Sequence, residues 1–201
     1  MSLSGSSNMM NAINNYKNNM TVENLDCCIY FICQEVKGKH RVDIACLDSC
    51  RKCKEVCIDS CHIFSGAGIG FDFIQFSKLG LKDPYHVALF VKGYSDQGIT
   101  YYIYDPTYVQ FNDKHYCIDK GCYYKGPGNY MDEEVRDQLI RNGFLPLTTQ
   151  NMKAYIDSFI DAYNNRSDID VKLSKEDVYS ILSDHLDEFG FSFDYRASSR
   201  N

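Results

Sequence analysis

The sequence contains no tryptophan, only 4 prolines among its 201 residues, and no apolar run long enough to span a bilayer. Basic residues are also scarce: 21 Lys and Arg stand against 27 Asp and Glu, so the formal net charge is −6. Proteins that bind nucleic acid need a basic surface that meets the phosphate backbone. The charge balance therefore argues against nucleic acid as the main partner, and the missing apolar run argues against a membrane span.

A secretory signal is also missing from residues 1–20, which have neither a basic start nor an apolar middle. This matters because the chain has 10 cysteines, a number that in a small secreted protein would indicate a disulfide framework. Without a signal, reduced thiols are the better interpretation. The cysteines are then expected to serve as core residues, metal ligands or a nucleophile in a cytoplasmic protein.

The order of the predicted elements indicates an α+β fold. Hydrophobic residues make up 44% of the chain, which is enough for one domain with a sizeable core. We expect a flexible or weakly helical N-terminus over residues 1–20 and a single domain over residues 21–201. Helices followed by strands and then by a helical C-terminal part, from about residue 129, are typical of the α+β class. The predicted elements are a buried helix at 27–36, an amphipathic helix at 44–63, strands at 86–93 and 98–105, and helices at 131–142, 151–164 and 175–189.

The two predicted strands flank a loop at residues 94–97, with Gly93 and Gly98 at its ends. If the two glycines face each other, His86 lies directly opposite Asp105, with Cβ atoms about 4.5–5.5 Å apart. An imidazole and a carboxylate at that separation form a hydrogen bond, and the carboxylate then orients the histidine as a general base. A slip of one residue would turn Asp105 to the other face, so the prediction depends on the length of the loop.

A base of this kind needs a nucleophile, and Cys27 and Cys28 stand at the expected start of the buried helix. Asp26 is a good N-cap residue, and the partial positive charge at a helix N-terminus favours a thiolate. We therefore expect Cys27 or Cys28 to be the nucleophile, in the chain order Cys, His, Asp. The competing interpretation is that both are inert core residues, because a buried cysteine packs as a small hydrophobe.

Five further cysteines repeat along one face of the predicted helix at 44–63 and raise the question of a metal site. They are Cys46, Cys50, Cys53, Cys57 and Cys61. Structural zinc sites usually take their ligands from short knuckles on separate turns rather than from one straight helix. Because these cysteines occupy the positions at which an amphipathic helix needs apolar residues, we predict that they belong to the core and bind no metal.

The motifs around the histidine and the aspartate resemble those of the papain-like cysteine enzymes. This superfamily includes peptidases, transglutaminases, CHAP-type amidases and bacterial effector deamidases. The segment HVALFV, which begins at His86, resembles the histidine strand of the amidases. The segment IYDPTYVQF, which contains Asp105, resembles the aspartate turn of the transglutaminases and effector proteases. The resemblance covers residues 24–112.

The same resemblance leaves both candidate nucleophiles open. A polar residue before the thiol favours Cys27, whereas the pattern Cys-x-x-Phe, which ends at Phe31, favours Cys28. The family often has Trp or a small residue after the nucleophile, and this chain has a second Cys or an Ile there. The family also implies an oxyanion hole made by the nucleophile's own N–H and a side-chain amide, for which Asn24 is a candidate.

The resemblance implies a papain-like core in which a buried nucleophile helix packs against an antiparallel sheet. It further implies a cysteine-dependent amide hydrolase or acyl transferase that acts on a protein or peptide through a thioester acyl-enzyme and needs no cofactor. Peptidase, glutamine deamidase and transglutaminase activities all stay open, as do the acyl acceptor and the oligomeric state. Delivery into a host cell as an effector is an alternative to a cytoplasmic location. Two other classes compete with an enzyme: a cysteine-rich zinc-binding domain and a catalytically inactive interaction domain.

Overall fold

The computed structural model describes residues 3–42, 52–74, 86–108, 115–117, 122–124, 133–165 and 171–196. Its elements are, in chain order, α1 (Leu3–Asn18), α2 (Val22–His40), α3 (Cys53–Ala67), β1 (Gly70–Phe73), β2 (Leu89–Ser95), β3 (Gly98–Tyr104), β4 (His115–Cys117), β5 (Cys122–Tyr124), α4 (Glu133–Asn142), β6 (Phe144–Pro146), α5 (Thr149–Asn164) and α6 (Lys175–Phe189).

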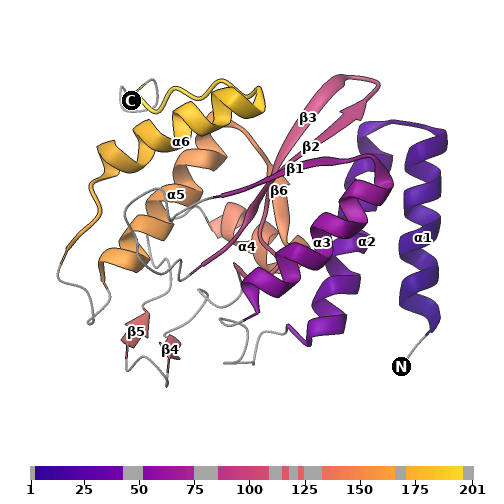
Figure 1. Cartoon of the computed structure of the whole chain (residues 1–201), viewed down its shortest axis with the longest axis horizontal. Helices are drawn as coiled ribbons and strands as arrows, with labels where there is room; N and C mark the ends of the chain where they lie inside the picture. The colour runs from indigo at the N-terminus through magenta and orange to yellow at the C-terminus, as the bar shows by residue number, and fades with distance from the viewer. Residues whose placement is uncertain are drawn as a thin grey trace.

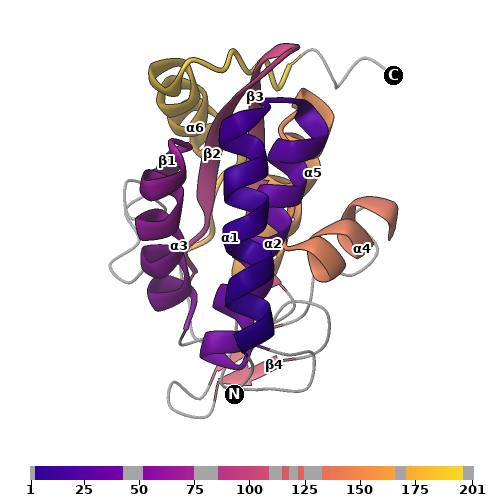
Figure 2. The same cartoon turned by 90° about the vertical axis from the view of Figure 1, so that its right-hand side faces the viewer.

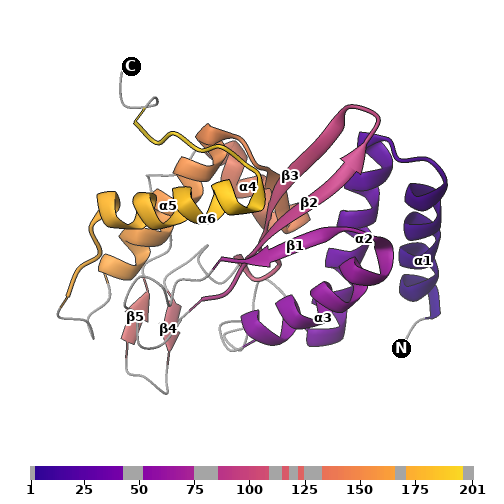
Figure 3. The ribbon, with the colours of Figure 1, turned by 45° about the horizontal axis from the view of Figure 1, so that its top comes forward.

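An antiparallel sheet with the strand order β1-β2-β3-β6 forms the middle of the structure, and helices cover both of its faces (Figure 1). Figure 3 shows α5 and α6 on one side of the sheet and α2 and α3 on the other. The outermost helix is α1, which lies against α2 (Figure 2). Strands β4 and β5 form a separate two-stranded sheet. The expected α+β class is confirmed.

Each face of the sheet belongs to a different hydrophobic core. Leu89 and Val91 pack with the side chains of α2 and α3, whereas Phe90, which lies between them, packs with those of α5 and α6. This alternation follows from the pleat of a β-strand. His86 shortly precedes β2 and Asp105 directly follows β3, so both residues lie at the end of the sheet that is opposite the β2–β3 turn.

Helix α2 begins one turn earlier than the sequence suggested. Thr21 is its N-cap, and the Thr21 side chain accepts a hydrogen bond of 3.2 Å from the backbone N–H of Asn24. The prediction that Asp26 caps this helix is therefore wrong. The earlier start places Leu25 in the core with no exposed surface, and the Asp26 carboxylate accepts a hydrogen bond of 2.5 Å from the hydroxyl of Tyr102.

The β2–β3 turn is shorter than predicted. Ser95 pairs with Gly98, so the turn consists of Asp96 and Gln97 alone, and the predicted pairing of Gly93 with Gly98 is wrong. The Ser95 hydroxyl closes this turn by donating to the Gly98 carbonyl at 3.1 Å and accepting from the Gln97 N–H at 3.2 Å.

Gly93 has a packing role instead of a turn role. A β-carbon at Gly93 would lie 2.5 Å from a methyl carbon of Leu25. Glycine at this position therefore lets α2 approach the sheet closely. From the sequence alone, a glycine needed for close packing cannot be told apart from one needed for a turn.

The helices predicted in the C-terminal part are confirmed as α4, α5 and α6, with starts that differ by at most two residues. Strand β6 lies between α4 and α5, was not predicted, and extends the sheet beyond β3. At the other end of the chain, α1 buries Met9, Ile13 and Tyr16. None of the described helices has both the length and the apolar character that a membrane span requires.

Candidate active site

His86 and Asp105 form a direct hydrogen bond at the open end of the β2–β3 pair. The Nε2 atom of His86 lies 2.6 Å from Oδ2 of Asp105, and neither residue has any exposed surface. Backbone pairing stops at Leu89 and Tyr104. The predicted meeting of imidazole and carboxylate is confirmed, although the register that led to it differs by two residues.

The two-residue error is harmless because side chains on a strand alternate with a period of two. A shift of one residue would have placed the two side chains on opposite faces, whereas a shift of two keeps them on the same face. His86 and Asp105 thus lie diagonally across the strand ends rather than directly opposite each other.

The Asp105 carboxylate is held by several donors. Its Oδ1 accepts hydrogen bonds from the backbone N–H and the hydroxyl of Thr107, both at 3.2 Å. Its Oδ2 accepts from the hydroxyl of Tyr155 at 2.8 Å, in addition to His86. The backbone N–H of Asp105 donates to the Gly143 carbonyl at 2.8 Å. The carboxylate position is therefore fixed from both oxygens and from the main chain.

The thiol that meets this pair belongs to Cys53, the first residue of α3. Its side chain hydrogen-bonds to His86, and only 6% of Cys53 is exposed. Because Nε2 of His86 is engaged by Asp105, Nδ1 is the ring nitrogen that remains for the thiol. Figure 1 shows that α3 begins at the same end of the sheet as β2. The three side chains thus come from a helix start, a strand start and a strand end.

The pKa of His86 reflects its two neighbours. Burial of the ring lowers this pKa, but the negative charge and hydrogen bond of Asp105, together with the hydrogen bond and charge of Cys53, raise it to about 9. The surroundings of His86 therefore favour its protonated form. The Cys53 thiol, at the start of α3, lies beside this imidazole.

Cys27 and Cys28 lie elsewhere in the fold. The start of α2 is tied to the β2–β3 turn, because the N–H of Asp96 donates to the Met20 carbonyl at 2.7 Å and the N–H of Val22 donates to the Asp96 carboxylate at 3.3 Å. At about 3.3 Å per residue, the chain from that turn back to His86 covers roughly 30 Å. The structure therefore does not bring either cysteine to the histidine.

The surroundings of these two cysteines differ from each other. Cys27 is exposed, whereas Cys28 is fully buried in the core that α2 shares with the sheet. Burial, followed by the charge of Cys27, raises the pKa of Cys28 to about 12. The expected oxyanion donor Asn24 is also at this end, where its side-chain amide donates to the Asn19 carbonyl at 2.8 Å.

The sequence assigned Cys53 to the core together with its neighbours, and Cys53, Cys57 and Cys61 are all buried. Cys57 and Cys61 are buried among apolar side chains, whereas Cys46 and Cys50 lie outside the described residues. No group of three potential metal ligands occurs within the described ranges. The signal that separates Cys53 from the others is its place at the first turn of α3, and the sequence does not reveal where α3 begins.

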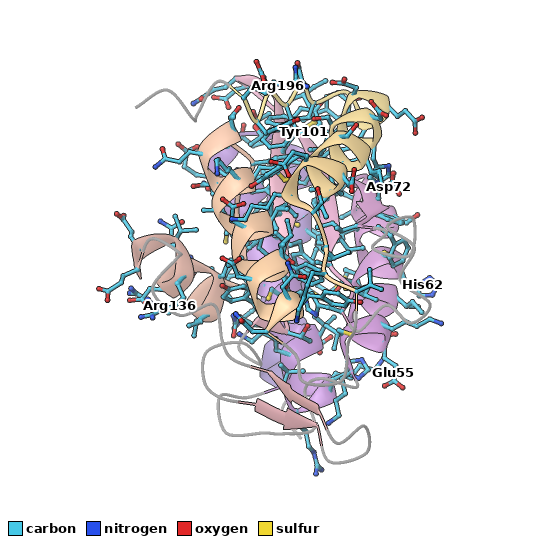
Figure 4. All side chains as sticks on the ribbon, turned by 90° about the vertical axis from the view of Figure 1, so that its left-hand side faces the viewer. Glu55, His62, Asp72, Tyr101, Arg136 and Arg196 are labelled. Atoms are coloured by element: carbon cyan, nitrogen blue, oxygen red, sulfur yellow. The ribbon has the colours of Figure 1, made fainter. Side chains whose placement is uncertain are left out.

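Polar contacts connect the first half of α3 to the end of α2. The Asp59 carboxylate lies 2.7 Å from Nε2 of His40 and 2.5 Å from Nζ of Lys39. The Lys52 ammonium donates to the His40 carbonyl at 2.8 Å. Figure 4 shows Glu55 on the outer side of α3, turned away from the sheet. These contacts hold the helix start that carries Cys53 against a second helix.

Comparisons of this chain with protein-family models, with curated proteins and with solved structures find no match. The chemistry of the site therefore has to be argued from its own geometry. A thiol, an imidazole and a carboxylate in hydrogen-bonded sequence constitute a nucleophile, a base and an orienting group.

Proposed function

We propose that this chain is a papain-like cysteine enzyme, an amide hydrolase or acyl transferase in which Cys53 is the nucleophile. The observation that carries this proposal is the chain of hydrogen bonds from Cys53 to His86 and on to Asp105. The thiol starts a helix that packs on an antiparallel sheet, as the resemblance of the His and Asp motifs implies. The chain order Cys, His, Asp also stays as expected, with the nucleophile moved to Cys53.

In the first step, the Cys53 thiolate attacks the carbonyl carbon of an amide, and the carbonyl π electrons move to oxygen. His86 holds the proton at Nδ1 and transfers it to the departing nitrogen when the tetrahedral intermediate collapses to a thioester. Asp105 stabilises the imidazolium and accepts the hydrogen bond from Nε2 of His86 with its Oδ2 atom. Nδ1 of His86 therefore faces the Cys53 sulfur.

In the second step, water or an amine attacks the thioester. His86 takes a proton from that nucleophile, and the Cys53 sulfur leaves. Peptidase, glutamine deamidase and transglutaminase reactions share these two steps and differ in the substrate amide and the acyl acceptor. The proposed substrate is a protein or peptide, encountered in the cytoplasm or in a host cell after delivery as an effector.

Substoichiometric iodoacetamide with mass-spectrometric mapping tests the assignment on the native chain. We expect Cys53 to be alkylated first although it is almost buried, and faster than the exposed Cys27, which provides an internal reference thiol. In His86→Ala, the Cys53 rate is expected to fall while the Cys27 rate stays the same. Equal rates at the two thiols, or a Cys53 rate that does not respond to His86→Ala, would refute the proposal.

One observation favours a second candidate, a catalytically inactive papain-like domain used for protein interaction. His86 and Asp105 are completely buried, and a substrate must reach the thiol beside them. This candidate predicts a stable fold in which Cys53 resists iodoacetamide at neutral pH. The same labelling experiment therefore distinguishes the two functions.

A further inference from the structure

Helix α5 contacts the back of the His86–Asp105 pair with one face. Tyr155 and Phe159, which are separated by one helical turn, both lie on it. The Tyr155 hydroxyl donates to Asp105 Oδ2 at 2.8 Å, and the Phe159 ring centroid lies 5.9 Å from that of His86. The N-cap residue Thr148, which accepts from the Asn151 N–H at 3.0 Å, fixes where this helix starts.

Asp105 Oδ2 is shared between two donors, the Tyr155 hydroxyl and His86 Nε2. A carboxylate has about four acceptor positions, and at Asp105 they are matched by His86 Nε2, the Tyr155 hydroxyl and the two donors of Thr107. The side chain thus has one orientation that satisfies every donor. Tyr155 is only 1% exposed, so water does not compete for its hydroxyl.

We infer that Tyr155 is a positioning residue for the proposed catalytic pair: its hydroxyl fixes the Asp105 carboxylate and draws on the same oxygen that binds His86. The catalytic consequence of this inference rests on the proposed function, but the effect of Tyr155 on His86 does not. Without the Tyr155 hydroxyl, Oδ2 of Asp105 accepts a hydrogen bond from His86 alone. The Asp105–His86 hydrogen bond then becomes stronger, and His86 holds its proton more tightly.

The test compares Tyr155→Phe with Tyr102→Phe. Tyr102 is a matched control, because it is also 1% exposed and also donates to a carboxylate, that of Asp26 near the other end of the sheet. The measurement is a titration of the His86 imidazole by NMR, with the resonance assigned by its loss in His86→Gln. We expect Tyr155→Phe to raise the pKa of His86 by up to about one pH unit and Tyr102→Phe to leave it unchanged.

A titration of His86 in Tyr155→Phe that coincides with the wild-type curve, or moves to lower pH, would overturn the inference. Should Tyr155→Phe fail to fold, site-specific replacement of Tyr155 by 3,5-difluorotyrosine keeps the ring and strengthens the donor. The inference then requires a shift of the opposite sign, toward lower pH, and an unchanged curve would overturn it.

Alkylation of Cys53 in the same variants connects the titration to catalysis. We expect the neutral-pH rate in Tyr155→Phe to rise by up to about tenfold, the factor that one pH unit in the His86 pKa corresponds to, because the more tightly held proton favours the Cys53 thiolate, and to stay unchanged in Tyr102→Phe. If Cys53 proves unreactive in the wild-type chain, the proposed function fails, while the titration still reports on Tyr155. If the alkylation rate of Cys53 falls in His86→Ala but the pKa of His86 is unchanged in Tyr155→Phe, only the inference about Tyr155 fails.

Discussion

The imidazole of His86 and the carboxylate of Asp105 meet at 2.6 Å although both residues lie just beyond the paired segments of β2 and β3. The ladder of backbone hydrogen bonds therefore does not fix this contact by itself. The turn after β3, through Thr107, and strand β6, through the carbonyl before it at Gly143, hold Asp105 in place. The contact thus depends on the turn after β3 and on the residue before β6.

Removing the negative charge of Asp105 is expected to change both the pKa of His86 and the reactivity of Cys53. In Asp105→Asn, the pKa of His86 is expected to fall, because the attraction that raises it against burial is lost. The rate of Cys53 alkylation should decrease by about 10²–10⁴, the range for loss of a well-oriented base. The matched control is Asp26→Asn, since Asp26 is also a carboxylate bonded to a buried tyrosine. Equal rates in the two variants would count against the proposed role of Asp105.

Gly143 provides a test of how closely the turn after β3, which contains Asp105 and Pro106, packs on α2. Its φ is +77°, and a β-carbon there would overlap the Cys33 sulfur and come within 3.3 Å of the Pro106 backbone. Gly68 has nearly the same φ, +76°, but a β-carbon at Gly68 would meet no atom of the described residues within 4 Å. Gly68→Ala therefore measures the cost of the left-handed backbone alone, about 1 kcal/mol.

We expect Gly143→Ala to lower the free energy of unfolding by roughly 1–3 kcal/mol more than Gly68→Ala, because overpacking adds to the backbone cost. Urea titration of both variants measures the difference. Adding Cys33→Ala to Gly143→Ala should recover part of the loss by removing the overlapping sulfur. If the two glycine variants are equally stable, Cys33 does not restrict this position.

The sequence predicts the base and its carboxylate better than it predicts the nucleophile, and the reason is physical. Strand periodicity tolerates a register error of two residues, so His86 and Asp105 remain on one face. A helix start has no such tolerance. Asp26 has the side chain of a good N-cap but lies inside α2, whereas Lys52, the actual N-cap of α3, makes no capping hydrogen bond with its side chain.

Strand β6 could not be predicted for a different reason. It has 3 residues, ends in Pro146, and owes its place in the sheet to pairing with β3. A segment this short has too little alternation to indicate a strand, and proline at its end suits an edge position. Helices α5 and α6 were predictable because their apolar residues recur over four turns, yet nothing in that pattern indicates that Tyr155 reaches Asp105.

The different roles of Cys28 and Cys53 lead to opposite expectations for substitution by alanine. Cys28 is fully buried in the core, so Cys28→Ala should lower the free energy of unfolding by about 1–2 kcal/mol and leave the fast alkylation of Cys53 intact. Cys53→Ala should abolish the fast alkylation phase. Thermal unfolding and iodoacetamide kinetics on both variants separate the two effects. A fast phase that survives Cys53→Ala and disappears in Cys28→Ala would reverse the assignment.

The raised pKa of His86 also predicts how stability depends on pH. The group titrates at 6.5 when unfolded and at about 9 when folded, so the folded state binds the proton more tightly. The resulting stabilisation is complete below pH 6.5 and is lost as the pH rises through 9, with a total on the order of 3 kcal/mol. Urea titrations of the wild type and of His86→Gln from pH 6 to 9 measure it.

The informative quantity is the difference in unfolding free energy between these two proteins. Burial raises the pKa of Cys57, and such thiols add their own loss of stability toward pH 9, but this loss is common to both proteins and cancels. We expect the difference to stay constant below pH 6.5 and to shrink steadily above it. In Asp105→Asn, which keeps the imidazole but removes its main attraction, the same slope should be much smaller. A difference that is flat from pH 6 to 9 would mean that His86 does not hold an extra proton in the folded chain, and the thiolate–imidazolium pair proposed for the site would then lack its cation.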